Sequence, residues 1–74
     1  MTKLPVISGE SCIKALQRAG FYITRQHGSH VIMRRDEPFA RTSVPKHRTL
    51  KTGTLRGIIR DAGMTVEEFI ELLG

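Results

Sequence analysis

The sequence predicts an α+β fold with the order helix, strand, strand, strand, helix and a short terminal helix. Two stretches, residues 9–19 and 52–62, place apolar residues at the spacing of an amphipathic helix. Between them, residues 21–44 contain three strand-like runs separated by turn sequences too short to join anything but antiparallel neighbours. Neither main helix can bury its apolar stripe alone. We therefore expect both to cover the same face of a three-stranded antiparallel sheet.

The first helix is expected to run from about Gly9 to Ala19. Ser8 is a good N-cap, Glu10 places an acid where the helix dipole favours it, and Gly20 can supply the left-handed C-terminal cap. The apolar residues at helical spacing on its inward face are Cys12, Ile13, Leu16 and Ala19. Cys12 is expected to be packed and not nucleophilic.

The three strands are rich in aromatic and β-branched residues and are expected at Phe21–Gln26, His30–Arg35 and Phe39–Val44. The turn between the first two is expected to be His27–Ser29. In the second strand, Val31 and Met33 share one face, while His30 and Arg34 lie on the other. We expect Val31 and Met33 to pack under the helices, which leaves His30 and Arg34 on the open side. A slip of one residue would reverse this assignment.

The C-terminal part of the chain is expected to form the other two helices. Thr52 can cap the second helix, which ends at Gly63. Thr65 and Glu68 have the spacing of a capping box for a short third helix. Two basic residues of the second helix lie one turn apart and point away from its apolar stripe: Arg56 and Arg60.

The length of 74 residues predicts one domain, residues 1–74, which buries about 60% of the surface of its unfolded chain. An active site would therefore lie on the surface. All 12 Lys and Arg lie in residues 1–60, which carry a net charge of +9, whereas residues 61–74 carry −4. Such a basic body attracts polyanions. A single cysteine, no signal-peptide core and no long apolar run predict a cytoplasmic protein without a membrane partner.

His30 is the residue whose type and position most clearly favour a role in catalysis. It follows Gly28 and Ser29 at a tight bend, and histidine suits proton transfer because its ordinary pKa lies near 6.5. RNA cleavage needs a proton removed from the 2′-hydroxyl, a proton given to the leaving 5′-oxygen and stabilisation of the phosphate, and Lys46, His47 and nearby cations can supply the remaining parts. The alternative is that His30 has no catalytic role and is a strand-end residue whose imidazole is hydrogen-bonded to a backbone carbonyl.

Several motifs taken together resemble the HicA (YcfA-like) mRNA interferase toxins. They are Gly20-Phe21, Gly28-Ser29-His30, Val44-Pro45 with His47, Gly53-Thr54-Leu55-Arg56 and Ile58-Ile59-Arg60-Asp61-Ala62-Gly63. The resemblance covers roughly residues 8–73. It implies a fold similar to the double-stranded-RNA-binding domain, metal-independent cleavage of mRNA and inhibition by a cognate HicB-like antitoxin. His30 occupies the position of the catalytic histidine, and His27 stands where Lys or Arg is frequent.

The expected activity is thus that of an endoribonuclease with His30 as the catalytic residue and no cofactor. The expected substrate-binding residues are Gly28, Ser29, Arg34, Lys46, His47, Arg56 and Arg60. The alternative is a non-catalytic RNA-binding module that uses phosphate contacts and A-form shape without cutting. A DNA-binding or membrane-surface role ranks below both, and a zinc site of His27, His30 and His47 is not expected because no Asp or Glu lies near them in the chain.

Overall fold

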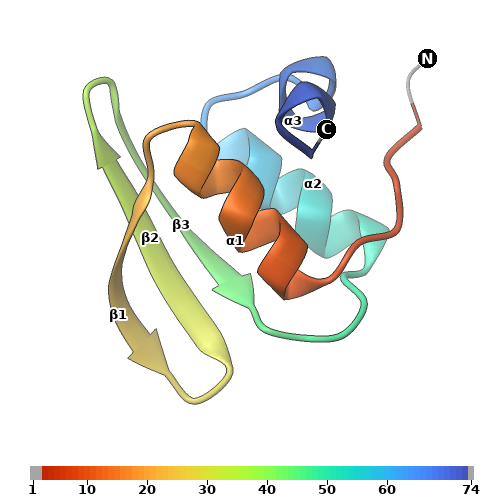
Figure 1. Ribbon diagram of the computed structural model, residues 1–74, viewed down its shortest axis with the longest axis horizontal. Coiled ribbons are helices and arrows are strands. Elements are labelled where there is room, and N and C mark those ends of the chain that lie inside the picture. Colours follow the sequence, from red (N-terminus) through yellow and green to blue (C-terminus); the bar gives the residue numbers. More distant parts are fainter. Residues whose placement is uncertain (1–2, 74) are drawn as a thin grey trace.

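The computed structural model describes residues 3–73, so the ends of the predicted domain, residues 1–2 and 74, lie outside it. Its elements follow the predicted order (Figure 1). They are α1 (Gly9–Arg18), β1 (Tyr22–His27), β2 (His30–Asp36), β3 (Phe39–Pro45), α2 (Thr52–Asp61) and α3 (Val66–Leu73). The predicted α+β fold class is confirmed.

The three strands form an antiparallel sheet in the order β1-β2-β3. Gly28 and Ser29 alone make the turn between β1 and β2, because His27 is already the strand partner of His30. The predicted turn was one residue too long. Gly28 has a φ of 56° whereas Ser29 does not have positive φ, which fits a two-residue hairpin turn with glycine at its first position.

β1 contains an irregularity between Ile23 and Arg25 that leaves Thr24 without a partner in the register of β2. The Thr24 hydroxyl donates a hydrogen bond to the carbonyl of Ile32 at 3.2 Å. Such a bulge increases the local bend of a strand. All six residues of β1 are exposed.

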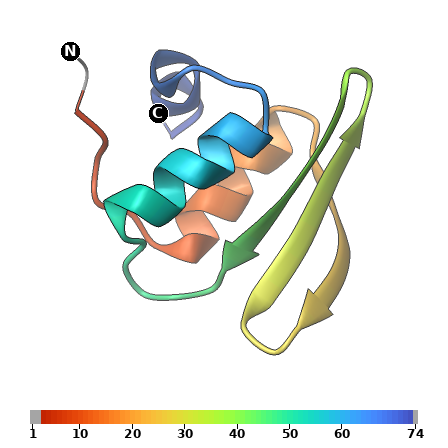
Figure 2. The ribbon, with the colours of Figure 1, turned by 180° about the vertical axis from the view of Figure 1, so that it is seen from behind.

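Both main helices lie on one face of the sheet and contact β3, while α3 packs across their ends (Figures 1 and 2). Val31 and Met33 are fully covered on that face, whereas His30 and Arg34 are exposed on the other. The predicted facing of β2 is therefore confirmed. The buried apolar residues come from every helix, from β2 and β3 and from three connecting positions: Cys12, Ile13, Ala15, Leu16, Phe21, Val31, Met33, Ala40, Val44, Leu50, Leu55, Ile58, Ile59, Ala62 and Phe69.

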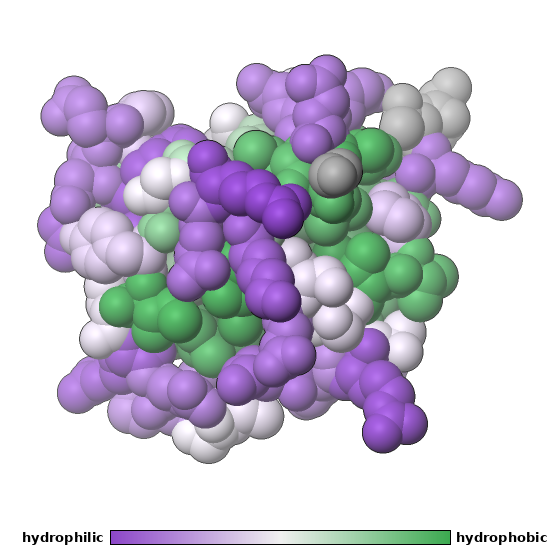
Figure 3. All heavy atoms as spheres, viewed as in Figure 1, coloured by the Kyte–Doolittle hydropathy of each residue, from purple (hydrophilic) through white to green (hydrophobic). Residues whose placement is uncertain are grey.

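β1 extends beyond this helical layer and leaves apolar surface exposed. A hollow of about 210 Å³ between β1 and α1 is lined by Ile13, Ile23 and Val31, among other residues. Figure 3 shows apolar surface in this region bordered by hydrophilic side chains. Ile23 is 47% exposed there, because α1 does not reach far enough to cover it.

The helix caps agree with the sequence in two of three cases. The Ser8 side chain accepts a hydrogen bond from the Ser11 backbone N–H at 3.1 Å. Thr65 and Glu68 form the reciprocal pair of a capping box, with bonds of 2.8 and 3.1 Å. The prediction that Thr52 caps α2 is wrong. Lys51 is the N-cap residue of α2, because its carbonyl accepts the first hydrogen bond of the helix, from the Leu55 N–H at 2.9 Å. The Lys51 side chain makes no capping hydrogen bond.

The start of α1 lies directly against the loop that follows β3. The Gly9 N–H donates to the His47 carbonyl at 2.8 Å, and the Leu50 N–H donates to the Ile7 carbonyl at 2.8 Å. A Cβ at Gly9 would lie 2.1 Å from the carbonyl oxygen of Pro45, so no side chain fits there. This backbone contact fixes the position of residues 45–50.

We predict that Gly9→Ala lowers the free energy of unfolding by about 1–3 kcal/mol, because the new methyl group displaces the Pro45 backbone. Gly53→Ala is the matched control, since a Cβ at Gly53 meets nothing within 4 Å. In a helix, this second change is expected to raise stability by about 0.5–1 kcal/mol. Urea unfolding of both variants measures the difference. Equal midpoints for the two would contradict the close approach of α1 to the loop.

Candidate active site

His30 lies at the first position of β2, at the end of the sheet where the hairpin turns. It is flanked on one side by His27 of β1 and on the other by Pro45 of β3. Its side chain is exposed on the face that the helices leave open. The tight Gly28-Ser29 turn thus presents the imidazole at the surface, as the sequence predicted.

His47 approaches His30 from the loop after β3. The two ring centroids are 6.5 Å apart, and the ring planes meet at 70°. Both rings line a surface hollow of about 440 Å³. The other residues that line it are Ser43, Pro45, Thr49, Leu50, Lys51 and Thr54. Two imidazoles, an ammonium and three hydroxyl-bearing residues therefore surround one open space.

Two backbone contacts hold this arrangement together. The Lys46 N–H donates to the Ser29 carbonyl at 2.6 Å, which ties the loop to the hairpin turn. The carbonyl of His47 accepts from the Gly9 N–H at 2.8 Å, which ties the same loop to α1. These two bonds fix the main chain of the loop, from which the His47 side chain reaches the hollow.

The other predicted substrate-binding residues are dispersed. Lys46 lines the apolar hollow beside α1, on the other side of the sheet from His30, and so contributes to the hollow of His30 only through its backbone. Arg56 and Arg60 are exposed on α2 and do not line the hollow. Arg34 lies four residues along β2 from His30, in a separate hollow with Arg25 and Arg41. Lys51, Thr54 and Ser43 were not predicted, since only the folded loop brings them to His30.

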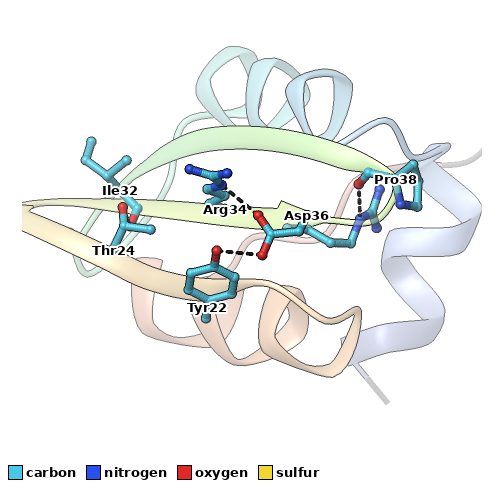
Figure 4. A network of polar contacts seen from close by, with 7 residues as sticks. Tyr22, Thr24, Ile32, Arg34, Asp36 and Pro38 are labelled. Carbon is cyan, nitrogen blue, oxygen red and sulfur yellow. Dashed lines mark hydrogen bonds and ion pairs between the residues drawn. The ribbon is translucent and has the colours of Figure 1, made fainter.

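Arg34 belongs to a polar network on the open face of the sheet (Figure 4). The Tyr22 hydroxyl donates to Asp36 Oδ2 at 2.8 Å, and Arg34 Nε donates to Asp36 Oδ1 at 2.8 Å. The guanidinium of Arg34 also lies over the Phe39 ring, 5.3 Å from its centroid. The hydrogen bond from Tyr22, helped by Arg34, lowers the pKa of Asp36, and the same hydrogen bond raises the pKa of Tyr22.

Cys12 does not take part in either region. Its side chain is fully covered, and this burial raises the pKa of the thiol to about 12. A thiol with that pKa is protonated at neutral pH and is a poor nucleophile. The cysteine is therefore part of the core, as predicted.

Within residues 3–73, no three His, Cys, Asp or Glu side chains are grouped closely enough to hold a metal ion. In the same part of the chain, no helix has both the length and the apolar character needed to span a membrane.

The chain matches a known protein family. A family model described as "HicA toxin of bacterial toxin-antitoxin" matches residues 9–64. The matched segment runs from the first residue of α1 to the residue after Gly63, and so includes His30, His47 and every other predicted site residue. No individual curated protein matches the chain.

We predict that Tyr22→Phe raises the pKa of Asp36 towards that of an ordinary aspartate, because the carboxylate loses the hydroxyl that stabilises its charge. The lowered pKa stabilises the fold above the pKa of the unfolded chain, and this contribution is lost as the pH falls through the folded value. Tyr22→Phe should therefore flatten the loss of stability in acid. NMR titration of the carboxyl carbon measures the shift, with Thr24→Val as the control on the same face. An unchanged Asp36 titration in Tyr22→Phe would contradict the network.

Proposed function

Because the HicA model matches well over half of its length, the chain belongs to the HicA toxin family of bacterial toxin–antitoxin systems, and we propose that it cleaves mRNA with His30 as the catalytic residue. The observation that supports this proposal is the exposed pair of imidazoles, His30 and His47, facing one open hollow. The excess of positive charge over residues 1–60 favours a polyanionic substrate.

The proposed reaction uses the nucleophile that RNA itself carries. The 2′-oxygen attacks the adjacent phosphorus as its proton passes to a base, and the bond from phosphorus to the 5′-oxygen breaks as an acid protonates that oxygen. The products are a 2′,3′-cyclic phosphate and a 5′-hydroxyl end. Two proton transfers and stabilisation of the phosphate are all that the reaction requires.

His30 and His47 have a separation that suits this reaction. Their ring centroids lie 6.5 Å apart and both rings line the same hollow, so one phosphate bound there can contact both imidazoles. We assign one proton transfer to His30 and contact with the same phosphate, opposite His30, to His47. The hydrogen bond from the Gly9 N–H to the His47 carbonyl fixes the main chain from which the His47 side chain projects.

Cations near the hollow would stabilise the phosphate. Lys51 lines the hollow, and we assign to it the binding of the phosphate that the chemistry requires. Gly28 and Ser29 would position the substrate through the turn itself. Three other basic residues lie outside the hollow: Lys46, Arg56 and Arg60. They would contact only parts of a longer RNA that lie away from the scissile bond.

No metal ion is needed in this scheme. One proton transfer falls to the imidazole of His30, solvent water exchanges the other proton, and stabilisation of the phosphate falls to Lys51 and His47, which line the same hollow. The proposed activity is therefore metal-independent.

A toxin of this kind acts with an antitoxin, and we propose a HicB-like partner that covers the hollow of His30. The toxin carries its positive charge over residues 1–60, so an acidic partner surface would be attracted to it and would exclude RNA from the same place. Protection of His30 from chemical modification in the complex would support inhibition by occlusion.

We predict that His30→Ala lowers the rate of RNA cleavage in excess EDTA by about 10²–10⁴-fold, because the reaction loses a positioned acid or base. His27→Ala is the control, since His27 is an exposed histidine paired directly with His30 but does not line the hollow. His47→Ala should also reduce the rate, whereas His27→Ala should not. Gel analysis of a labelled transcript measures all four proteins.

Two results would contradict this proposal in different ways. Equal cleavage by the parent and His30→Ala would show that His30 is not catalytic. An intact transcript after prolonged incubation with the parent, together with measurable RNA binding, would indicate a binding module that does not cut.

A further inference from the structure

Three arginines line one open hollow on the face of the sheet away from the helices. The hollow measures about 510 Å³, and its lining residues are Thr24, Arg25, Ile32, Arg34, Phe39 and Arg41. Every strand of the sheet contributes one arginine. Of the acids near them, Asp36 is bound by Arg34 and Tyr22, and Asp61 lines a smaller hollow with Arg41.

The register of the strands places two of these arginines directly opposite each other. Arg34 of β2 is the partner of Arg41 in β3. Like charges at opposed positions of a sheet are destabilising, so this pair is a local cost to the fold. Across residues 3–73, Arg25 and Arg41 have no hydrogen-bond or ion-pair partner that would offset the charge. A bound anion would remove the repulsion.

Arg34 is already oriented for such an anion. Its Nε donates to Asp36, the Asp36 carboxylate is held in turn by Tyr22, and the guanidinium rests over Phe39. One edge of the guanidinium is used in this network, and its two terminal nitrogens can still bind a phosphate in the bidentate geometry that arginine favours. Because the side chain is held in place, less conformational entropy is lost when the phosphate binds.

The arginine hollow and the hollow of His30 and His47 are separate, and a smaller hollow has lining residues in common with each of them. Ser43 lines the histidine hollow and also a smaller hollow that it shares with Ile32 and Arg41. Ile32 and Arg41 in turn line the arginine hollow. A path therefore runs along β2 and β3 from His30 to Arg34, four residues or about 13 Å of extended strand.

We propose that the open face of the sheet binds the RNA strand that flanks the cut, with Arg25, Arg34 and Arg41 taking one of its phosphates. This inference rests on the proposed function. The span from His30 exceeds one nucleotide, so the bound phosphate lies beyond the dinucleotide that carries the scissile bond. Phe39, 65% exposed at the end of the path, offers an aromatic ring for a base.

An RNA strand fits this face better than an acidic protein segment does. The three arginines lie side by side across the sheet, one on each strand, and a phosphodiester chain that leaves the hollow of His30 along the sheet presents a phosphate to them. The exposed aromatic ring beside the arginines adds a contact that a base can use and a carboxylate cannot.

The test compares substrates of two lengths with the parent and Arg41→Ala. With an RNA of about ten nucleotides, Arg41→Ala should raise KM roughly tenfold, equivalent to about 1.4 kcal/mol, and leave kcat unchanged. With a dinucleotide, which cannot reach Arg41, the two proteins should have the same KM and kcat. Lys3→Ala, which removes one charge from an exposed position elsewhere, is the control and should match the parent on both substrates.

A binding measurement keeps this inference separate from the proposed cleavage. Anisotropy with a 2′-O-methyl RNA, which lacks the nucleophile, should show weaker binding by Arg41→Ala and a salt dependence shallower by about 0.7 in the logarithmic slope. Urea unfolding should show no loss of stability, because the change relieves a like-charge pair.

Several outcomes would overturn the inference. Unchanged binding and unchanged KM in both Arg41→Ala and Arg25→Ala would exclude the open face as an RNA site, even if the parent cleaves RNA. Equal binding of polyglutamate and RNA, with the same dependence on Arg41, would show recognition of negative charge alone. If the parent binds the 2′-O-methyl RNA through Arg41 but never cleaves the normal RNA, the open face is an RNA-binding site, and both the proposed cleavage and its relation to a cut fail.

Discussion

The close approach of Gly9 to the backbone of Pro45–His47 is the constraint on which the candidate site depends. It joins the first turn of α1 to the loop that follows β3, and the hydrogen bond from Lys46 to Ser29 joins the same loop to the hairpin. These contacts involve main-chain atoms, so they fix where His47 lies with little help from its own side chain. Without them the loop would be free to move away from β2, and His30 would remain an isolated exposed histidine.

The sequence predicted the elements whose causes are local. The Ser8 cap, the capping box of Thr65 and Glu68 and the alternation of Val31 and Met33 depend on neighbours within one helix or strand, and all three are confirmed. Thr52 was wrongly predicted to cap α2. Lys51 and Thr52 are adjacent at the start of this helix, and the hydrogen bond from the Leu55 N–H to the Lys51 carbonyl identifies Lys51 as the N-cap.

The features that the sequence did not predict depend on contacts between distant segments. His47 was expected to act with His30 on chemical grounds, but the contact of α1 with the loop, which brings the two together, has no local pattern that indicates it. The pairing of Arg34 with Arg41 follows from the register of β2 and β3, which the weak alternation of these strands did not define. Lys46 was expected beside His30, but the loop turns its side chain to the opposite side of the sheet.

The likeness to a double-stranded-RNA-binding domain stays a prediction.

The central claim is that the hollow of His30 and His47 breaks RNA by attack of its own 2′-hydroxyl, without a metal. Analysis of the ends of the fragments tests this most directly, after incubation of the purified toxin with a defined RNA in excess EDTA. The account predicts 2′,3′-cyclic phosphate and 5′-hydroxyl ends, and no cut where the nucleotide before the scissile bond is 2′-deoxy. Fragments with 3′-hydroxyl and 5′-phosphate ends, or equal cutting at the 2′-deoxy position, would contradict it.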